Sequence, residues 1–299
     1  MKEIIYDGDF GVDDGLALIL ALNSGVVDVK AVTTVNGNTS SENAARNATR
    51  ILNYLGKKNV PVNAMMPSTA LYSGKEVHGE DGMGDSFLPK YERAIEPWSF
   101  FDVVTQASKG ARTLVATGPL TNVAETLKRF PGFDEVIIMG GAINVPGNID
   151  RRSEFNFYAD PQAANYVLTK TPGIRKVLVP LDVTDHTLLT PEHLKRIRNT
   201  KSGKLARSIV KGYHDFYKSR GFDGNPLHDP LAMGYAIDPT FLELEEMDVR
   251  VETKGEYTRG MCVVEERGWM KKYNNVFVAT KVERKEFLEY FVETISRKK

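Results

Sequence analysis

A short acidic segment near the N-terminus carries the side chains best suited to chemistry. It reads Asp7-Gly8-Asp9-Phe10-Gly11-Val12-Asp13-Asp14, which places four carboxylates in eight residues. So much negative charge in one place is unfavourable unless water or a cation screens it, and a hard divalent cation prefers oxygen ligands of this kind. Asp13 or Asp14 would also suit a helix cap, but capping accounts for one or two of the four. The segment therefore predicts a metal site.

A second interpretation of the same segment is a phosphatase. Asp7-x-Asp9 after a short apolar strand is also how a haloacid-dehalogenase-type phosphatase begins, with a nucleophilic aspartate and Mg²⁺. On these residues alone the two interpretations compete, so the rest of the chain has to separate them.

Strands and helices alternate along roughly the first 180 residues and would position these carboxylates. The predicted strands are Glu3–Tyr6, Val27–Val35, Thr113–Thr117, Val136–Met139 and Lys176–Val183, and the predicted helices are Asp13–Leu22, Ser41–Leu55, Asn122–Phe130 and Pro161–Leu168. Short apolar strands that alternate with helices imply an α/β fold, in which a mostly parallel open sheet is flanked by helices. Ligands of such sheets bind beyond the carboxyl ends of the strands. The polar residues of this chain follow its predicted strands, as that rule requires.

The remainder of the chain continues the same domain. Residues 191–217 are predicted to be helical and are rich in Lys and Arg, and a loop follows over residues 221–226. Late strands are predicted at 249–252, 260–264 and 276–280, and a closing helix at 283–296. Because no repeat, low-complexity segment or linker interrupts the chain, we predict a single domain over residues 1–299.

Composition excludes several classes of partner. Lys plus Arg and Asp plus Glu are equal at 39 each, so there is no net field to attract nucleic acid or an acidic membrane. The longest clean apolar run, Leu16 to Leu22, is far too short to cross a bilayer. The single cysteine, Cys262, excludes an internal disulfide framework and is predicted to be a small buried side chain in a strand. With no signal peptide visible, these features predict a cytoplasmic protein that binds neither nucleic acid nor membrane.

Several motifs, taken together and in order, resemble the inosine-uridine nucleoside hydrolase family. Residues 7–14 resemble its opening signature, Asp-Thr-Asp-Pro-Gly-x-Asp-Asp, with Gly8 and Phe10 in place of threonine and proline. These two departures could change the shape of the loop, but they remove no expected ligand. The other matching segments are Gly37-Asn38, Thr117-Gly118-Pro119-Leu120-Thr121-Asn122, Met139-Gly140-Gly141-Ala142, Pro146-Gly147-Asn148, Glu154-Phe155-Asn156 and Pro226-Leu227-His228-Asp229-Pro230-Leu231-Ala232. A dehalogenase-type phosphatase has no reason to carry this ordered set.

The resemblance implies a calcium site and a catalytic base. Asp9, Asp14 and Asp229 would hold Ca²⁺ through their carboxylates, and the main-chain carbonyl of Thr117 would be a further ligand, so that the side chain of Thr117 need not matter. Calcium accepts six to eight oxygen ligands, and substrate hydroxyls and a water would complete the set. Asp9 would also act as general base toward the calcium-bound water, although a role as ligand alone stays open.

The resemblance also implies a ribose subsite. Asp13 would accept a hydrogen bond from a ribose hydroxyl, and Asn38, Asn148, Glu154 and Asn156 would bind the remaining ribose hydroxyls. Amide and carboxylate side chains supply donors and acceptors at fixed angles, as sugar binding needs. From the residues alone, a structural interpretation competes, because asparagine is a common turn residue and Asp13 suits a helix cap.

The side of the site that faces the nucleobase is predicted to contain histidines and aromatic residues. His228 would protonate the leaving base, since its imidazole titrates near neutrality. By the resemblance, His78 would lie on a loop over the base, and Phe155 would lend an aromatic face near the sugar or belong to the core. The residues that set base preference are expected around 76–84 and at Tyr213 and Tyr217.

The sequence thus predicts an enzyme that hydrolyses the N-glycosidic bond of ribonucleosides with a calcium-bound water. The resemblance further implies a homodimer or homotetramer. The alternatives left open are the phosphatase and a non-catalytic nucleoside-binding protein, which would keep the ribose-binding residues but not need the metal ligands.

Overall fold

The computed structural model describes the chain except for residues 65–73, 85–99, 268, 271–273 and 298–299. The strands are β1 Lys2–Gly8, β2 Val27–Thr34, β3 Val62–Ala64, β4 Thr113–Ala116, β5 Glu135–Met139, β6 Arg175–Val179, β7 Leu188–Leu189, β8 Asn225–Pro226, β9 Leu242–Met247, β10 Val249–Val251, β11 Cys262–Val264 and β12 Val276–Val282. The helices are α1 Val12–Ser24, α2 Ser41–Tyr54, α3 Lys75–His78, α4 Phe100–Ala107, α5 Thr121–Arg129, α6 Phe155–Ala159, α7 Pro161–Thr169, α8 Leu181–Thr184, α9 Pro191–Arg196, α10 Lys201–Ser219, α11 His228–Ile237, α12 Arg284–Ile295 and the short 3₁₀ helix η1 Pro239–Phe241.

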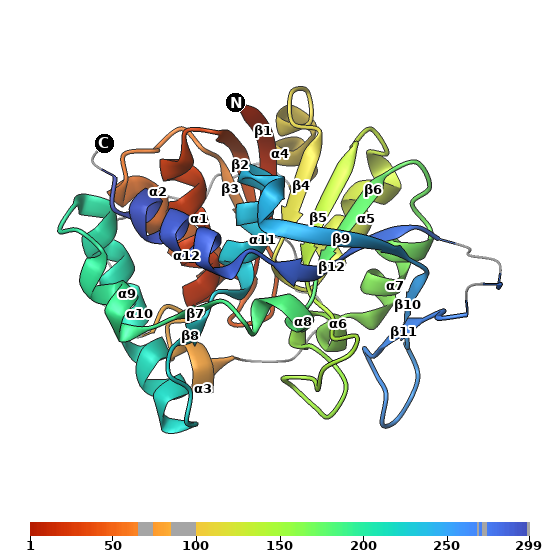
Figure 1. The fold of residues 1–299 in the computed structure, drawn as a ribbon. Coiled ribbons are helices and arrows are strands. Elements are labelled where there is room, and N and C mark those ends of the chain that lie inside the picture. Colours follow the sequence, from red (N-terminus) through yellow and green to blue (C-terminus); the bar gives the residue numbers. More distant parts are fainter. Residues whose placement is uncertain (65–73, 85–99, 268, 271–273, 298–299) are drawn as a thin grey trace.

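A mostly parallel sheet forms the centre of the protein, as predicted (Figure 1). Eight strands pair in the order β3-β2-β1-β4-β5-β6-β12-β9, and every pair is parallel except β12 with β9. The edge strand β9, with the sequence LELEEM, alternates apolar and acidic residues. Charged side chains of this kind protect an edge strand from pairing with other chains. Strand β9 was not predicted from the sequence.

Alternate residues of the sheet supply two apolar layers. Ile4 and Val115 belong to the cluster that contains the buried residues of α1, α10, α11 and α12, whereas Ile5 and Leu114 belong to the cluster with α4, α5 and α7. The two groups of helices lie on opposite sides of the sheet (Figure 1). Successive residues of a strand point to opposite faces, so strands that are apolar throughout can bury both faces. The two layers hold the strand ends rigidly in place.

The order of the strands reverses beside β1. From β1 the chain proceeds to β2 and β3 on one side, whereas β4, β5 and β6 extend on the other side. At such a switch point the connections leave the carboxyl ends of two neighbouring strands in opposite directions and open a crevice between them. The acidic segment follows β1, and Thr117 follows β4, so the fold brings these two segments together.

Two predicted elements differ more from the structure than the others, whose ends shift by at most two residues. The strand predicted over Lys176–Val183 ends at Val179, because Pro180 has no N–H for the sheet and precedes α8. The predicted helical region over residues 191–217 is divided into α9 and α10, and α10 continues to Ser219. The division has a local cause, since the Thr200 side chain accepts the N–H of Gly203 and caps a new helix.

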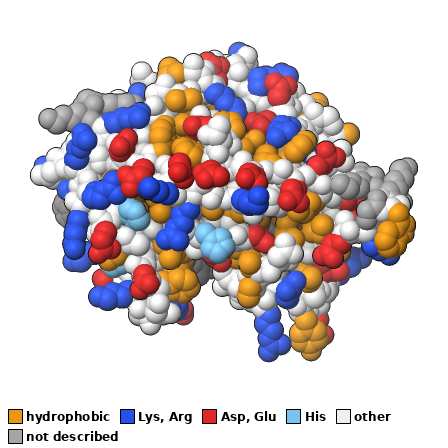
Figure 2. Space-filling view, in the orientation of Figure 1, with side chains coloured by type: hydrophobic (Ala, Val, Ile, Leu, Met, Phe, Trp, Pro, Cys, Tyr) orange, Lys and Arg blue, Asp and Glu red, His pale blue; other side chains and the backbone are white. Residues whose placement is uncertain are grey.

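The surface and the single cysteine agree with the expectations from composition. Acidic and basic side chains are interspersed over the face in Figure 2 rather than separated into fields of one sign. Cys262 is buried in β11, as predicted, and burial raises the pKa of its thiol to about 12. Within the described part of the chain, every helix is too short or too polar to cross a membrane.

Candidate active site

Three carboxylates from two helix N-termini meet beside the switch point. Asp13 and Asp14 are in the first turn of α1, and Asp229 is in the first turn of α11. All three are buried, and each offers an oxygen within 4.8 Å of the others. The N-terminus of a helix carries partial positive charge, so two converging helix ends favour carboxylates here. The fold thus joins residues that are more than 200 positions apart in the sequence.

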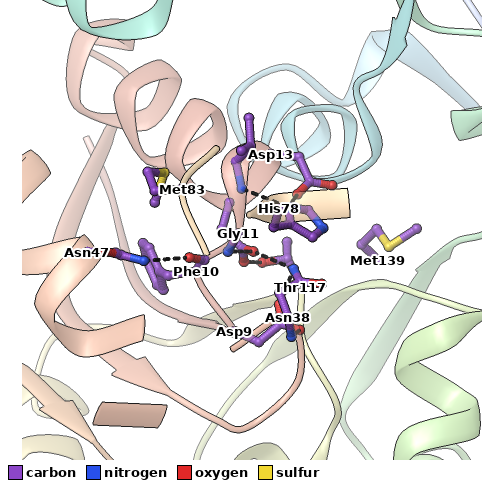
Figure 3. Close-up of polar contacts among 12 residues, drawn as sticks. Asp9, Phe10, Gly11, Asp13, Asn38, Asn47, His78, Met83, Thr117 and Met139 are labelled. Carbon is purple, nitrogen blue, oxygen red and sulfur yellow. Dashed lines mark hydrogen bonds and ion pairs between the residues drawn. The ribbon is translucent and has the colours of Figure 1, made fainter. Parts of the chain in front are cut away.

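Asp9 adjoins this group from the end of β1. Its carboxylate accepts hydrogen bonds from the backbone N–H of Asn38 at 2.7 Å and from the Asn38 side-chain amide at 3.1 Å, and the same amide lies 3.5 Å from Asp14 Oδ2. Gly37 makes this approach possible, because a Cβ there would lie 2.0 Å from Asp9 Oδ2. Figure 3 shows Asp9 and Asn38 side by side below Thr117. The structure thus brings Asn38 to the acidic cluster as predicted, in contact with a carboxylate.

Several groups besides the Asn38 amide hold Asp14 in place. It accepts the N–H of Gly11 at 2.8 Å and the hydroxyl of Thr117 at 2.6 Å, and the hydroxyl of Tyr6 lies 3.5 Å away. The first of these contacts joins the third residue of a helix to its N-cap, as in a capping box. The Thr117 side chain, which was predicted not to need to matter, thus contacts a predicted metal ligand through its hydroxyl. Neither Tyr6 nor this hydroxyl was singled out in the sequence.

The two departures from the family signature have structural consequences. Gly8 is required by close packing, because a Cβ at this position would lie 2.3 Å from Asp14 Oδ1. Phe10 has φ +32°, which a proline ring, fixed near −65°, could not adopt. The Phe10 ring is fully buried, with its centroid 5.3 Å from that of Tyr6. The backbone at Phe10 therefore has a conformation that the proline of the family signature could not adopt.

Asp7, which lies within β1, has hydrogen-bond partners different from those of the other carboxylates in its segment. It accepts hydrogen bonds from the hydroxyl of Thr33 at 2.6 Å and from the amide of Asn122 at 2.7 Å. Burial raises its pKa to about 7. A phosphatase nucleophile has to face its substrate, whereas the Asp7 carboxylate is bound by Thr33 of β2 and Asn122 of α5. This arrangement argues against the phosphatase interpretation.

The cluster fits a cation in both charge and donor type. Burial raises the pKa of Asp9 well above its usual value, and the charge of Asp14 raises it further. Burial likewise raises the pKa of Asp229, followed by the charges of Asp13, Asp14 and Asp9. Among the described residues, no Lys or Arg pairs with these carboxylates, and buried Asp13 Oδ1 has no hydrogen-bond partner. Oxygen donors that repel one another and lack a cationic partner are what Ca²⁺ or Mg²⁺ binds.

Two of the residues predicted to bind ribose hold backbone groups. Glu154 caps α6 by accepting the N–H groups of Asn156 and Phe157, and it also accepts that of Gly141 at 3.0 Å. Burial raises its pKa to about 7. The amide of Asn156 donates to the carbonyls of Thr117 at 2.9 Å and Met139 at 3.3 Å. Asn156 is therefore tied to the carbonyl that was predicted to be a metal ligand.

Asn148 and Phe155 lie at the outer edge of this region. The side-chain oxygen of Asn148 accepts the N–H of Phe155 at 2.9 Å, while Asn148 itself is exposed and Phe155 is half-buried. Their predicted roles at the ribose stay predictions, and a core position for Phe155 is not supported by its partial exposure.

His228 begins α11 directly before Asp229. Its Nδ1 lies 2.7 Å from the hydroxyl of Thr184, and burial lowers its pKa to about 4. The expected titration near neutrality is therefore not supported in this setting, because a buried imidazole favours its neutral form. Thr184, which ends α8, was not identified as a functional residue in the sequence.

His78 lies over the start of α1 from the short helix α3. Its Nδ1 accepts the N–H of Val12 at 3.1 Å, so the neutral ring carries its proton on Nε2. Burial, and to a smaller extent the neighbouring His228, lowers its pKa to about 3. Its ring stacks on Tyr213 at 5.4 Å, and Tyr213 meets Tyr217 at 4.9 Å. The histidines and tyrosines expected near the base thus gather on one side of the carboxylates.

The fold and this geometry define an α/β protein with a buried oxygen-ligand pocket at its switch point. The sequence pattern of the family described as inosine-uridine preferring nucleoside hydrolase matches residues 4–289. The chain belongs to that family. The predicted class of enzyme, a ribonucleoside hydrolase, is thereby confirmed, and the non-catalytic alternative is not needed.

Individual relatives support the same assignment. The chain is 37% identical to the pyrimidine-specific ribonucleoside hydrolase RihA of Klebsiella pneumoniae, with 98% of each chain covered, and 34% identical to RihA of Shewanella woodyi, again with 98% of each covered. Among solved structures it is similar to a purine-preferring ribonucleoside hydrolase from Gardnerella vaginalis, with a TM-score of 0.90, 32% identity and coverage of 99% and 98%. A plant nucleoside hydrolase, PpNRh1, matches with a TM-score of 0.91, 28% identity and 99% coverage of both chains.

Proposed function

We propose that this enzyme cleaves ribonucleosides to the free base and ribose at the pocket formed by Asp9, Asp14 and Asp229, with Ca²⁺ as its ion. The observation that carries the proposal is the convergence of Asp229 with the α1 carboxylates in a buried cluster without a cationic partner. The Thr117 carbonyl, fixed by the Asn156 amide, would complete the protein ligands. When bound, Ca²⁺ supplies positive charge that binds oxygen atoms of water and ribose.

We assign to Asp9 the role of general base, which removes a proton from the attacking water. Its carboxylate is fixed by two hydrogen bonds from Asn38, so its position is set before substrate arrives. Asp13, whose Oδ1 has no hydrogen-bond partner, is suited to accept a hydrogen bond from a ribose hydroxyl. Asn148, Glu154 and Phe155 would lie along the rest of the sugar, and the Asn156 side-chain oxygen would be left to contact it. These roles support attack at the anomeric carbon while the bond to the base breaks.

The base would lie beside His228, His78 and Tyr213. In this proposal the neutral His228 ring accepts the hydroxyl hydrogen of Thr184 at Nδ1 and donates a hydrogen bond from its Nε2–H to the leaving base. Uridine and cytidine are the first substrates to test, since the relatives of 34–37% identity over 98% of both chains are named pyrimidine-specific. We also propose a homodimer or homotetramer in the cytoplasm, which size-exclusion chromatography with light scattering and cell fractionation would test.

Removal and return of the metal test the proposed function directly. A strong chelator is expected to stop release of uracil from uridine, and added Ca²⁺ is expected to restore it, because the repelling carboxylates need a cation. Free base is measured by chromatography, with inosine and cytidine run alongside. Full turnover in the chelator, or restoration by Mg²⁺ only together with phosphate release from phosphorylated substrates, would contradict the proposal.

The state of His228 predicts a pH profile. Because burial lowers its pKa to about 4, His228 is neutral well above that value, so kcat/KM for uridine should not fall between about pH 6 and pH 8. If a protonated imidazole with an ordinary pKa were required, kcat/KM would fall about tenfold for each pH unit above about 6.5. The measurement is a kcat/KM profile at saturating Ca²⁺, and such a fall, absent in His228→Ala, would disprove the neutral-donor role.

A further inference from the structure

Asn47 joins two segments of the site without touching any residue predicted to act on substrate. It lies on α2 and is fully buried. Its amide nitrogen donates to the carbonyl of Phe10 at 3.3 Å and to the carbonyl of Asp81 at 2.9 Å. Figure 3 shows the amide of Asn47 reaching the Phe10 backbone from the side opposite Thr117. Because both partners are carbonyl oxygens, only the nitrogen end of the amide can fill this position.

The Phe10 peptide sets the direction of the loop formed by residues 8–14, called the metal-binding loop below. Phe10 has φ +32°, a conformation that is strained for a residue other than glycine and persists only where the surroundings hold it. Its neighbours on either side are Asp9, which Asn38 anchors, and Gly11, whose N–H binds Asp14. A rotation of the Phe10 peptide would therefore shift one predicted ligand relative to the other. Asn47 is the side chain that holds its carbonyl.

The Asp81 carbonyl belongs to the segment that carries His78. Within this segment Gly84 donates its N–H to the carbonyl of His78 at 2.6 Å, and Asp81 accepts the N–H of Met83 at 2.7 Å. The segment meets the metal-binding loop where Val12 donates to His78 Nδ1 and where that nitrogen lies 3.9 Å from Asp13 Oδ1. Asn47 adds a connection between the two segments that runs through helix α2 of the core.

We propose that Asn47 is a positioning residue that locks the metal-binding loop and the His78 segment into one arrangement. The inference rests on the proposed function. It predicts that the affinity for the ion and the position of the His78 ring both depend on Asn47, although Asn47 contacts neither the proposed ion nor His78. The structure also offers a matched comparison, because Asn43, one helical turn away, donates to the same Asp81 carbonyl at 2.8 Å and to Thr39 at 2.9 Å, but does not reach Phe10.

The test compares Asn47→Leu with Asn43→Leu by two measurements on the full chain. Calorimetric titration of Ca²⁺ into chelator-treated protein should give a dissociation constant about 10-fold higher for Asn47→Leu, as expected for residues that support metal ligands, and a nearly unchanged constant for Asn43→Leu. Amide hydrogen exchange should show faster exchange at Val12 in Asn47→Leu only, because His78 is the partner of that N–H. Asn47→Ser serves for both measurements if the leucine variant does not fold.

Each outcome decides the proposal. Equal Ca²⁺ affinities and equal Val12 exchange in all variants, with any loss confined to the melting temperature, would overturn the positioning role and leave the proposed function intact. If the wild-type chain bound none of Ca²⁺, Mn²⁺ or Mg²⁺, the metal site itself would be disproved, and the role of Asn47 with it. A parallel loss in Asn43→Leu would also overturn the proposal, because the Phe10 contact would then not be the cause.

Discussion

Replacing Asp229 with asparagine is expected to abolish both Ca²⁺ binding and nucleoside cleavage. The substitution keeps the size of the side chain but removes a charged ligand that closes the pocket from α11. We expect kcat/KM for uridine to fall by roughly 10³-fold or more, since loss of a metal ligand removes charge stabilisation at the reacting centre. The measurements are initial rates of base release and calorimetric titration with Ca²⁺.

The same variant should be more stable than the wild type when no ion is present. Burial and three neighbouring carboxylates raise the pKa of Asp229 well above its usual value. A group whose pKa is raised in the folded state loses its contribution to stability as the pH rises through that pKa. In chelator at a pH above neutrality, Asp229→Asn therefore removes a repulsion and should raise the melting temperature. Saturating Ca²⁺ should raise the wild-type melting temperature by roughly 4 °C and leave the variant unchanged.

Asp134→Asn is the matched control for this experiment. Asp134 is exposed and pairs with Arg112 on the surface, so its loss should change neither turnover nor the response to Ca²⁺. Near-normal turnover by Asp229→Asn, or a response to Ca²⁺ equal to that of the wild type, would refute the assignment of Asp229 as a ligand.

His228→Ala is expected to affect substrates according to their leaving groups. A nucleobase gains electron density as the bond to ribose breaks, so a donor at His228 lowers that barrier. With a nitrophenyl riboside, whose leaving group needs no proton, the kcat of the variant should fall by less than about 10-fold. With uridine and inosine, its kcat should fall by roughly 10²–10⁴-fold. Steady-state kinetics with the three substrates gives the comparison.

His186→Ala supplies the control for that series, because His186 is an exposed histidine on the connection after α8. It should leave all three rates near the wild-type values. Equal losses on the riboside and the nucleosides in His228→Ala would show that His228 acts on sugar binding or folding rather than on the base.

The arrangement of the sheet and the proximity of the carboxylates could be predicted, because both follow from the apolar and polar patterns and the motifs of the sequence. Apolar strands followed by polar turns predicted a parallel sheet with its site at the strand ends. The ordered set of motifs predicted that the acidic segment and Asp229 share one site. In the structure, one carboxylate oxygen each of Asp13, Asp14 and Asp229 lies within 4.8 Å of the others. Four carboxylates within eight residues repel one another, so their spacing alone indicates a cation site.

The supporting contacts were not predictable, because each depends on which way a side chain or a carbonyl points in three dimensions. Asp7 resembles its acidic neighbours in the sequence, yet the strand turns it toward Thr33 and Asn122. Thr117 was expected to contribute only a carbonyl, and its hydroxyl proves to hold Asp14. The positive φ of Phe10 could not be predicted from the sequence, because a positive φ is expected at glycine or asparagine and seldom at an aromatic residue.

A crystal structure of the chain grown with Ca²⁺ would test the central claim most directly. We predict one ion, about 2.3–2.6 Å from carboxylate oxygens of Asp9, Asp14 and Asp229 and from the carbonyl oxygen of Thr117. An ion bound elsewhere, or Asp229 turned away from an empty space between the two helix ends, would contradict the account.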